Sequence, residues 1–117
     1  MRNIDSLKNT SQFKEVYEHG RSAANGLLVV YVLAVEGNRQ RLGISVSKKV
    51  GNSVIRHRIT RLIRESFVQI RGCLPEGYSF VVVARGRAAQ KNYSDICNAL
   101  VSLMKRLDIY PDSGTEA

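Results

Sequence analysis

The chain has 117 residues, 44% of them apolar, and a formal net charge of +8 from 18 Lys and Arg against 10 Asp and Glu. This length fits one domain, and no stretch approaches the roughly 20 apolar residues that a membrane span needs. The first residues lack the apolar run of a secretory signal, so we expect a cytoplasmic protein with one domain over residues 1–117 and a flexible tail at 108–117.

The first predicted element is a helix over residues 11–19. Thr10 or Ser11 can cap its start. Phe13 and Tyr17 stand four residues apart and therefore share one side of the helix. That side either packs in the core, which the spacing alone favours, or offers rings on which nucleic-acid bases stack.

Two strands follow, and we expect them to pair as an antiparallel hairpin. Residues 27–35, which include Tyr31, are apolar and largely β-branched, which predicts a strand covered on much of both faces. Residues 41–47 alternate, with Ser45 and Ser47 on the face that carries the small side chains. That face leaves room for an extended strand of nucleotides beside the aromatic rings.

Residues 53–71 are predicted to form a helix with one apolar and one cationic side. Asn52 or Ser53 can cap it, and Ile, Leu and Phe recur at helical spacing along one stripe. The basic residues lie outside that stripe, and the free N–H groups of the helix N-terminus add an attraction for phosphate. The cations expected to gather there are Lys48, Lys49, Arg56, Arg58, Arg61 and Arg64.

The positive charge is concentrated around this helix. Residues 39–71 hold nine basic residues and one acid, Glu65, while the rest of the chain holds nine of each sign. A charge gathered in this way repels itself, which favours a polyanion as partner. An anionic membrane surface would require exposed apolar side chains opposite the cations, and here that side is predicted to be core.

A third strand over residues 78–84 and a last helix over residues 93–107 complete the pattern. The order α-β-β-α-β-α predicts an α+β fold, a two-layer sandwich with a small mixed sheet and room for an extra short strand. The unit from residue 41 to residue 84 predicts two parallel strands joined by a crossover, which the general rule makes right-handed.

The sequence offers no site for catalysis by the protein itself. Of its two histidines, His19 and His57, the second stands between Arg56 and Arg58. Glu65 is the lone acid on the basic helix, so paired carboxylates are missing, and neither a Gly-rich phosphate loop nor a nucleophile elbow is present. We therefore expect no catalytic residue and no metal ligands in this chain.

The stretch from residue 41 to residue 65 resembles the signature of bacterial ribonuclease P proteins. It reads Arg-Leu-Gly-Ile-Ser-Val-Ser-Lys-Lys-Val-Gly-Asn-Ser-Val-Ile-Arg-His-Arg-Ile-Thr-Arg-Leu-Ile-Arg-Glu. Residues 13–22 and 80–85 are similar to the first helix and the last strand of that family, so the resemblance spans about residues 7–107.

The resemblance implies an RNA-binding subunit of an endoribonuclease that removes the 5′ leader from precursor tRNA. In that family an RNA subunit carries the chemistry with Mg²⁺, while the protein holds the leader and stabilises the active RNA. The implied partners are the ribonuclease P RNA and precursor tRNA, with one copy of the protein in the holoenzyme and no cofactor of its own. The family fold also has a left-handed βαβ crossover, contrary to the general rule.

The resemblance also implies residue roles. The Arg-Asn-Arg motif of the family falls on Arg56, His57 and Arg58, and His in place of Asn removes the paired donor and acceptor of the amide, although it can still donate and stack. The residues implied to bind the catalytic RNA are Lys48, Lys49, Asn52, Arg56, His57, Arg58, Arg61 and Arg64. Those implied to line the leader-binding cleft are Phe13, Tyr17, Tyr31, Ser45 and Ser47.

Two other functions are compatible with a basic helix. A DNA-binding module would place it in a major groove, although no second helix is predicted a short turn away, and competition between duplex DNA and folded RNA separates the two. A nuclease with its own site would cleave precursor tRNA without an added RNA subunit.

Overall fold

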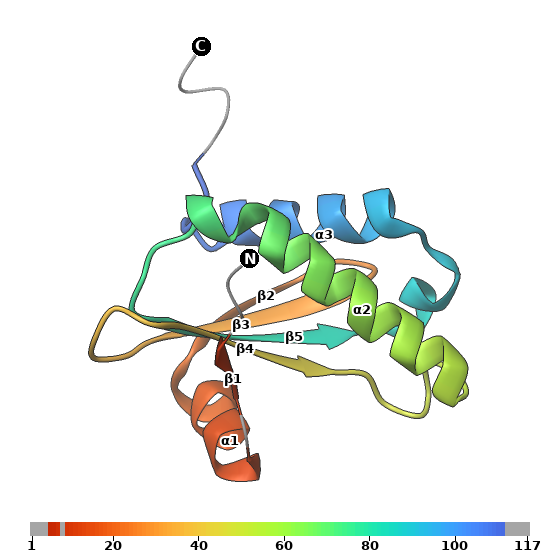
Figure 1. The fold of residues 1–117 in the computed structure, drawn as a ribbon, viewed down its shortest axis with the longest axis horizontal. Helices are drawn as coiled ribbons and strands as arrows, with labels where there is room; N and C mark the ends of the chain where they lie inside the picture. The colour runs from red at the N-terminus through yellow and green to blue at the C-terminus, as the bar shows by residue number, and fades with distance from the viewer. Residues whose placement is uncertain (1–4, 8, 112–117) are drawn as a thin grey trace.

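The computed structural model describes residues 5–7 and 9–111 (Figure 1). Its helices and strands, in chain order, are β1 (Asp5–Ser6), α1 (Thr10–His19), β2 (Arg21–Ala24), β3 (Leu28–Ala34), β4 (Gln40–Ser45), α2 (Ser53–Ile70), β5 (Tyr78–Ala84) and α3 (Tyr93–Arg106). Two short 3-10 turns, η1 (Arg71–Cys73) and η2 (Gly86–Gln90), precede β5 and α3.

The strands form one mixed sheet in the order β1-β4-β5-β3-β2. β5 pairs in parallel with β4 and antiparallel with β3, so the predicted hairpin between β3 and β4 is wrong. The cause lies in β5, where Phe80, Val81 and Val82 are all fully buried and cover both faces of the strand. A strand that is apolar on both faces is most stable at the centre of a sheet.

The helices lie on both faces of this sheet, with α2 and α3 on one side and α1 on the other (Figure 1). The main core lies under α2 and α3, where the rings of Phe67 and Phe80 meet with centroids 5.3 Å apart. A smaller cluster of Leu7, Val16 and Val81 lies under α1. The α+β class and the mixed sheet are therefore confirmed, and α1 adds partial cover to the second face.

Asparagine side chains set the start of every long helix. Asn9, Asn52 and Asn92 each accept a hydrogen bond from a backbone N–H three residues further on, which satisfies an otherwise unpaired donor. The expected cap of α1, Thr10 or Ser11, is thus replaced by Asn9. The other bounds lie within two residues of those predicted, but β4 ends at Ser45, so Ser47 lies outside the strand.

One glycine fixes the joint between α1 and β2. A Cβ added to Gly20 would lie 2.6 Å from the carbonyl oxygens of both Val16 and Val32, closer than any real side chain approaches backbone. Only glycine therefore lets α1 turn directly into the edge strand and lie against the sheet.

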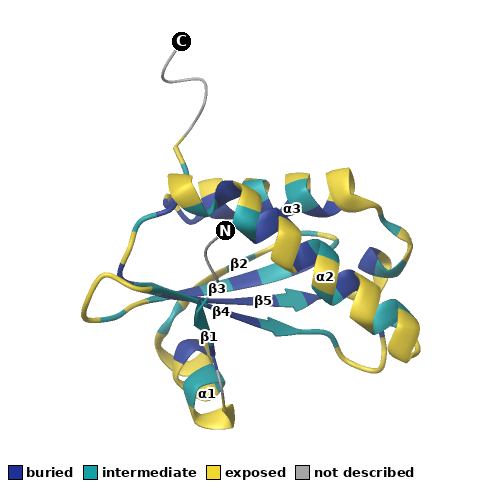
Figure 2. Ribbon diagram, in the orientation of Figure 1, coloured by how far each residue is buried: buried dark blue, intermediate teal, exposed yellow. Residues whose placement is uncertain are grey.

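The β4–α2–β5 unit is the predicted crossover between parallel strands. Its left-handed course stays a prediction of the resemblance. The unit positions α2 so that the side facing the sheet is buried and the outer side is exposed (Figure 2).

The chain stays packed for a short distance past α3. Ile109 is buried and Tyr110 packs against the main core, although both fall in the expected tail. The rest of that tail, residues 112–117, lies outside the described residues.

Candidate nucleic-acid interface

The outer side of α2 is cationic, and its inner side is core. Ile59, Ile63 and Phe67 are fully buried, whereas Arg61 and Arg64 are exposed. Arg58 and His57 are also exposed and Arg56 is half-buried. The helix thus separates the two sets of side chains as its periodicity predicts.

Two of the guanidinium groups are held by neutral carbonyl oxygens. Arg56 donates through Nε to the carbonyl of Gly51 at 3.1 Å. Arg58 donates to the carbonyls of Ala89 at 3.2 Å and Lys91 at 2.6 Å. These contacts orient the planar groups and leave their positive charge uncompensated, which suits them for phosphate oxygens.

Arg61 is the cation on this face that has a carboxylate within reach. Its Nη2 lies 3.5 Å from a carboxylate oxygen of Glu65, and both side chains are more than half exposed. Such exposed pairs contribute little and are easily exchanged. Since Glu65 is the single acid on α2, the face keeps a strong positive charge.

Lys48 and Lys49 are exposed in the turn that leads to the N-terminus of α2. The side-chain oxygen of Asn52 is occupied in capping that end, at 3.0 Å from the backbone nitrogen of Ile55. Asn52 is exposed, and its amide N–H groups are of a kind that can donate to a partner. We name the eight residues of this region the basic surface: Lys48, Lys49, Asn52, Arg56, His57, Arg58, Arg61 and Arg64.

The basic surface also contains a small apolar area that the sequence pattern does not predict. Val54 is 74% exposed, and with Leu62 it lines a shallow hollow of about 360 Å³ on the outer side of α2. His57, Arg58, Arg61 and the acid Glu65 line the same hollow. It can accept the sugar or base of a nucleotide whose phosphate the cations hold.

Aromatic rings gather on the opposite face of the sheet, beside α1. The rings of Tyr17 and Tyr31 meet edge to face with centroids 4.9 Å apart, and Phe13 lies 6.4 Å from Tyr17. Phe13 and Tyr31 pack partly against the small cluster under α1, whereas Tyr17 is 39% exposed. Phe13 therefore contributes to the core, whereas Tyr17 exposes its ring, and stacking on that ring stays a prediction.

Ser45 lies on the same face as these rings. Gly43, two residues earlier on β4, faces Phe13 so closely that an added Cβ would lie 2.6 Å from the ring. Because side chains two apart on a strand share a face, Ser45 points to the same side. Its neighbours across the sheet are Val83 and then Val29, both half-exposed.

These residues define the aromatic face: Phe13, Tyr17, Val29, Tyr31, Ser45 and Val83. Val29 and Val83 were missed because both stand in wholly apolar strands, where the pattern alone does not show which side chains reach the surface. Ser47 follows the end of β4, and its hydroxyl accepts from the backbone N–H of Lys49 at 3.3 Å, so its place on this face stays a prediction.

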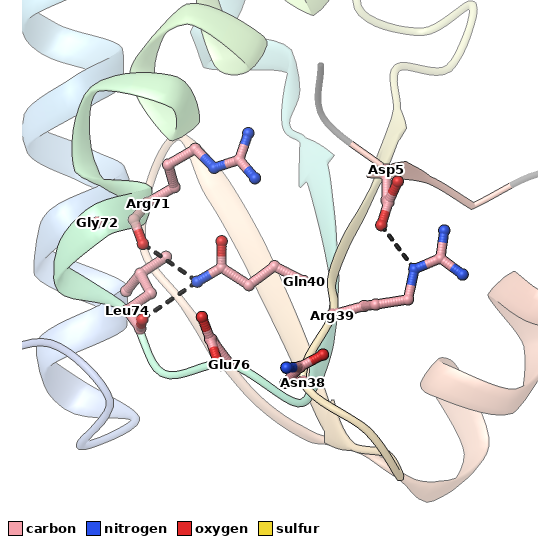
Figure 3. Close-up of a pocket in the computed structure, with 8 residues that line it drawn as sticks. All are labelled: Asp5, Asn38, Arg39, Gln40, Arg71, Gly72, Leu74 and Glu76. Atoms are coloured by element: carbon pink, nitrogen blue, oxygen red, sulfur yellow. Dashed lines mark hydrogen bonds and ion pairs between the residues drawn. The ribbon is translucent and has the colours of Figure 1, made fainter. Parts of the chain in front are cut away.

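The end of the molecule near the C-terminus of α2 carries charges of both signs. A hollow of about 450 Å³ there is lined by Asp5, Asn38, Arg39, Gln40, Arg71, Gly72, Leu74 and Glu76 (Figure 3). Arg39 is paired with Asp5 at 2.8 Å, and the Gln40 amide donates to the carbonyls of Arg71 and Leu74. The acids Asp5 and Glu76 balance the cations Arg39 and Arg71, so this hollow has no excess positive charge to attract a polyanion.

Residues 5–7 and 9–111 contain neither a membrane-spanning helix nor a metal-binding cluster. No helix in these ranges has the length and apolar character needed to cross a bilayer. Within the same ranges, His, Cys, Asp and Glu side chains do not come together in groups of three that could hold a metal ion.

Known proteins with similar sequences point to one family. A family model described as Ribonuclease P matches residues 1–108. The ribonuclease P protein component of Lachnoclostridium phytofermentans is 54% identical over 101 residues, which are 86% of this chain and 87% of that one. Its counterpart from Clostridium botulinum is 42% identical over 107 residues, or 91% and 96% of the two chains.

Solved structures agree with this result. The RNase P protein of Staphylococcus aureus has a TM-score of 0.84 at 34% identity and covers 93% of this chain and 100% of its own. The RNase P protein of Thermotoga maritima has a TM-score of 0.78 at 28% identity, with 90% and 97% covered.

Proposed function

This chain belongs to the ribonuclease P protein family, and on that premise we propose that its two surfaces divide RNA recognition between them. The family supplies the RNA-binding subunit of an endoribonuclease that processes precursor tRNA, and catalysis resides in the RNA subunit. In our proposal the basic surface docks on the ribonuclease P RNA, and the aromatic face takes the 5′ leader of precursor tRNA.

The docking role rests on one observation above all, the uncompensated charge of the outer side of α2. Arg56 and Arg58 are held in place by carbonyl oxygens, and Arg64 is exposed. Guanidinium groups fixed in this way meet phosphate oxygens without a further loss of side-chain freedom. The N-terminus of α2 adds a partial positive charge at the end where Lys48 and Lys49 stand.

The leader role is supported by the composition of the aromatic face. Tyr17 is exposed and is steadied by Tyr31, so its ring can stack on a base. Gly43 lets the ring of Phe13 lie directly on the sheet, and the small side chain of Ser45 leaves the next stretch of sheet surface low. An extended single strand is the form of RNA that exposes its bases for such contacts.

The docking role is tested by replacing Arg61 and Arg64 with alanine together. Each lost phosphate contact reduces the slope of log affinity against log salt by about 0.7–0.9, so the double variant should show a slope smaller by about 1.4–1.8. Binding of the full chain to ribonuclease P RNA is measured over a range of KCl concentrations.

Lys14→Ala provides the matched control, because Lys14 is an exposed cation on α1, on the other face of the sheet. It should leave the slope unchanged. A slope equal to that of the unaltered protein in the double variant would refute the docking role.

Three further features belong to the proposal. The Mg²⁺ of the reaction is expected on the RNA subunit. A single copy is expected in the holoenzyme, since the large apolar side chains exposed in the described ranges, Tyr17, Val54 and Tyr93, are scattered. The cytoplasm is the expected location, since precursor tRNA is made there.

A further inference from the structure

A second group of cations lies outside the basic surface, between β5 and α3. Arg85, Arg87 and Lys91 fall within seven residues that contain no acid. In the sequence these charges are offset by acids elsewhere in the chain. In the structure the segment lies at the same end of the molecule as the N-terminus of α2 (Figure 1).

The segment is joined rigidly to α2. Ala88, in the middle of η2, is fully buried in the main core. Arg58 reaches across from α2 and donates to the carbonyls of Ala89 and Lys91, the second at 2.6 Å. The basic surface and η2 therefore form one continuous body, and Arg58 belongs to both.

A hollow of about 540 Å³ lies between η2 and the turn from β2 to β3. Its lining consists of Gly26, Arg85, Gly86, Arg87, Ala89, Gln90 and Lys91. None of these residues carries a carboxylate, in contrast to the hollow at the far end of the molecule. An unbalanced positive hollow of this kind concentrates anions.

Neutral groups orient one cation that lines the hollow, Arg85, and a second that binds the turn from β2 to β3, Arg106. Arg85 donates to the carbonyl of Asn25 at 3.0 Å, and Arg106 donates to the carbonyl of Ala24 at 2.7 Å. Gly26 leaves room for Arg87, whose Nη1 would lie 3.4 Å from a Cβ at that position. The carbonyls fix the directions of the guanidinium groups without neutralising them, as they do for Arg56 and Arg58.

We propose that this hollow binds the phosphodiester backbone of the ribonuclease P RNA and extends the basic surface around the end of α2. The proposal rests on the docking role proposed above. The RNA subunit is favoured over the leader because η2 packs with α2 and α3, whereas the aromatic face lies on the opposite side of the sheet. Arg87 and Lys91 are the residues whose charge it uses most directly.

The test is the double replacement of Arg87 and Lys91 by alanine in the full chain. Binding to ribonuclease P RNA is measured against KCl concentration, and the slope should fall by about 1.4–1.8 for two lost phosphate contacts. Binding to precursor and to mature tRNA by the reconstituted holoenzyme is measured in parallel, and the ratio of the two affinities should stay unchanged.

Two controls separate charge from structure. The charge-conserving pair Arg87→Lys and Lys91→Arg should keep the slope close to that of the unaltered protein. Gly72→Ala, outside the hollow, adds a methyl group where nothing lies within 4 Å, and it should leave both folding and slope unchanged.

An unchanged slope in the double alanine variant overturns this inference, and it leaves the docking role intact if the Arg61 and Arg64 variant still lowers the slope. A loss confined to the ratio of precursor to mature tRNA also overturns it, because the hollow would then serve the leader. If neither double variant lowers the slope, the docking role fails as well.

Discussion

Val16 and Tyr17 are adjacent in α1, yet they serve different purposes. Val16 is 2% exposed and anchors the helix to the sheet, whereas Tyr17 is 39% exposed and leans on Tyr31. The spacing of Phe13 and Tyr17 predicted a shared side of the helix, and that is what the structure shows. The spacing could not show how deeply each ring is buried, because burial depends on contacts with Gly43 and Tyr31, in strands far along the chain.

Tyr17→Ala should weaken the binding of precursor tRNA more than that of mature tRNA. The exposed ring offers a stacking surface to a base of the leader, and such stacking contributes about 1–3 kcal/mol per base. Affinities of the holoenzyme for the two tRNA forms are to be compared, with Tyr93→Ala, an exposed tyrosine on α3, as the control. Equal losses for both tRNA forms would contradict a leader role.

The Asp5 and Arg39 pair should make stability depend on pH in acid. The hydrogen bond from Arg39, supported by the charges of Arg39, Arg41 and Arg71, outweighs burial and lowers the pKa of Asp5 below its ordinary 3.8. A carboxyl with a lowered pKa stabilises the fold above its ordinary pKa, and the effect is lost as the pH falls through the lowered value. Unfolding free energies of the protein and of Asp5→Asn should therefore differ near neutral pH and converge in acid; parallel curves at all pH values would refute the pair.

The pairing of β3 with β5 shows what the sequence pattern settles and what it leaves open. The residues of β3 and of β5 predict each of these two strands to within two positions of its bounds. Their pairing was not predicted, because strands that are neighbours in the chain were expected to pair. The buried run Phe80–Val81–Val82 is the signal that places β5 between β3 and β4 instead. The edge strands β1 and β2 are too short to show a period, and they form because β4 and β3 offer them partners.

Gly20→Ala should destabilise the protein by about 1–3 kcal/mol, the usual cost of forcing atoms into a packed site. The added Cβ meets the carbonyls of Val16 and Val32, which belong to backbone that cannot move independently. Urea unfolding measures the effect, with Gly86→Ala as the control in open space. Equal midpoints for the two variants would show that the joint between α1 and β2 is not tight.

Across the whole molecule, charge is sorted more sharply than the sequence shows. Along the sequence, the excess positive charge lies in residues 39–71, and the charges of the remaining residues sum to zero. In the structure, Arg85, Arg87 and Lys91 lie next to the N-terminal part of α2. The ion pair of Arg39 with Asp5 lies at the other end of the molecule. This sorting depends on where β5 ends, which only the assembled sheet determines.

Salt should therefore raise the stability of the free protein. Raising the ionic strength from about 0.01 to about 0.15 M shortens the Debye length from about 30 to about 8 Å, which screens the repulsion among the clustered cations. The thermal unfolding midpoint is the measurement, and the Arg61 and Arg64 double alanine variant should respond less. A midpoint that falls with salt would mean that ion pairs outweigh this repulsion.

The central place of β5 has a consequence for biosynthesis. β3 and β4 leave the ribosome before β5, but neither is the other's partner, and β5, the strand that joins them, is the last of the five to be made. A nascent chain that has reached η1 thus has the strands of the β2–β3 and β1–β4 pairs, each pair with an open edge where β5 will lie, and a complete cationic helix without the full sheet to pack on. Closure waits for Tyr78–Ala84, which makes folding of this protein a late event in its own translation.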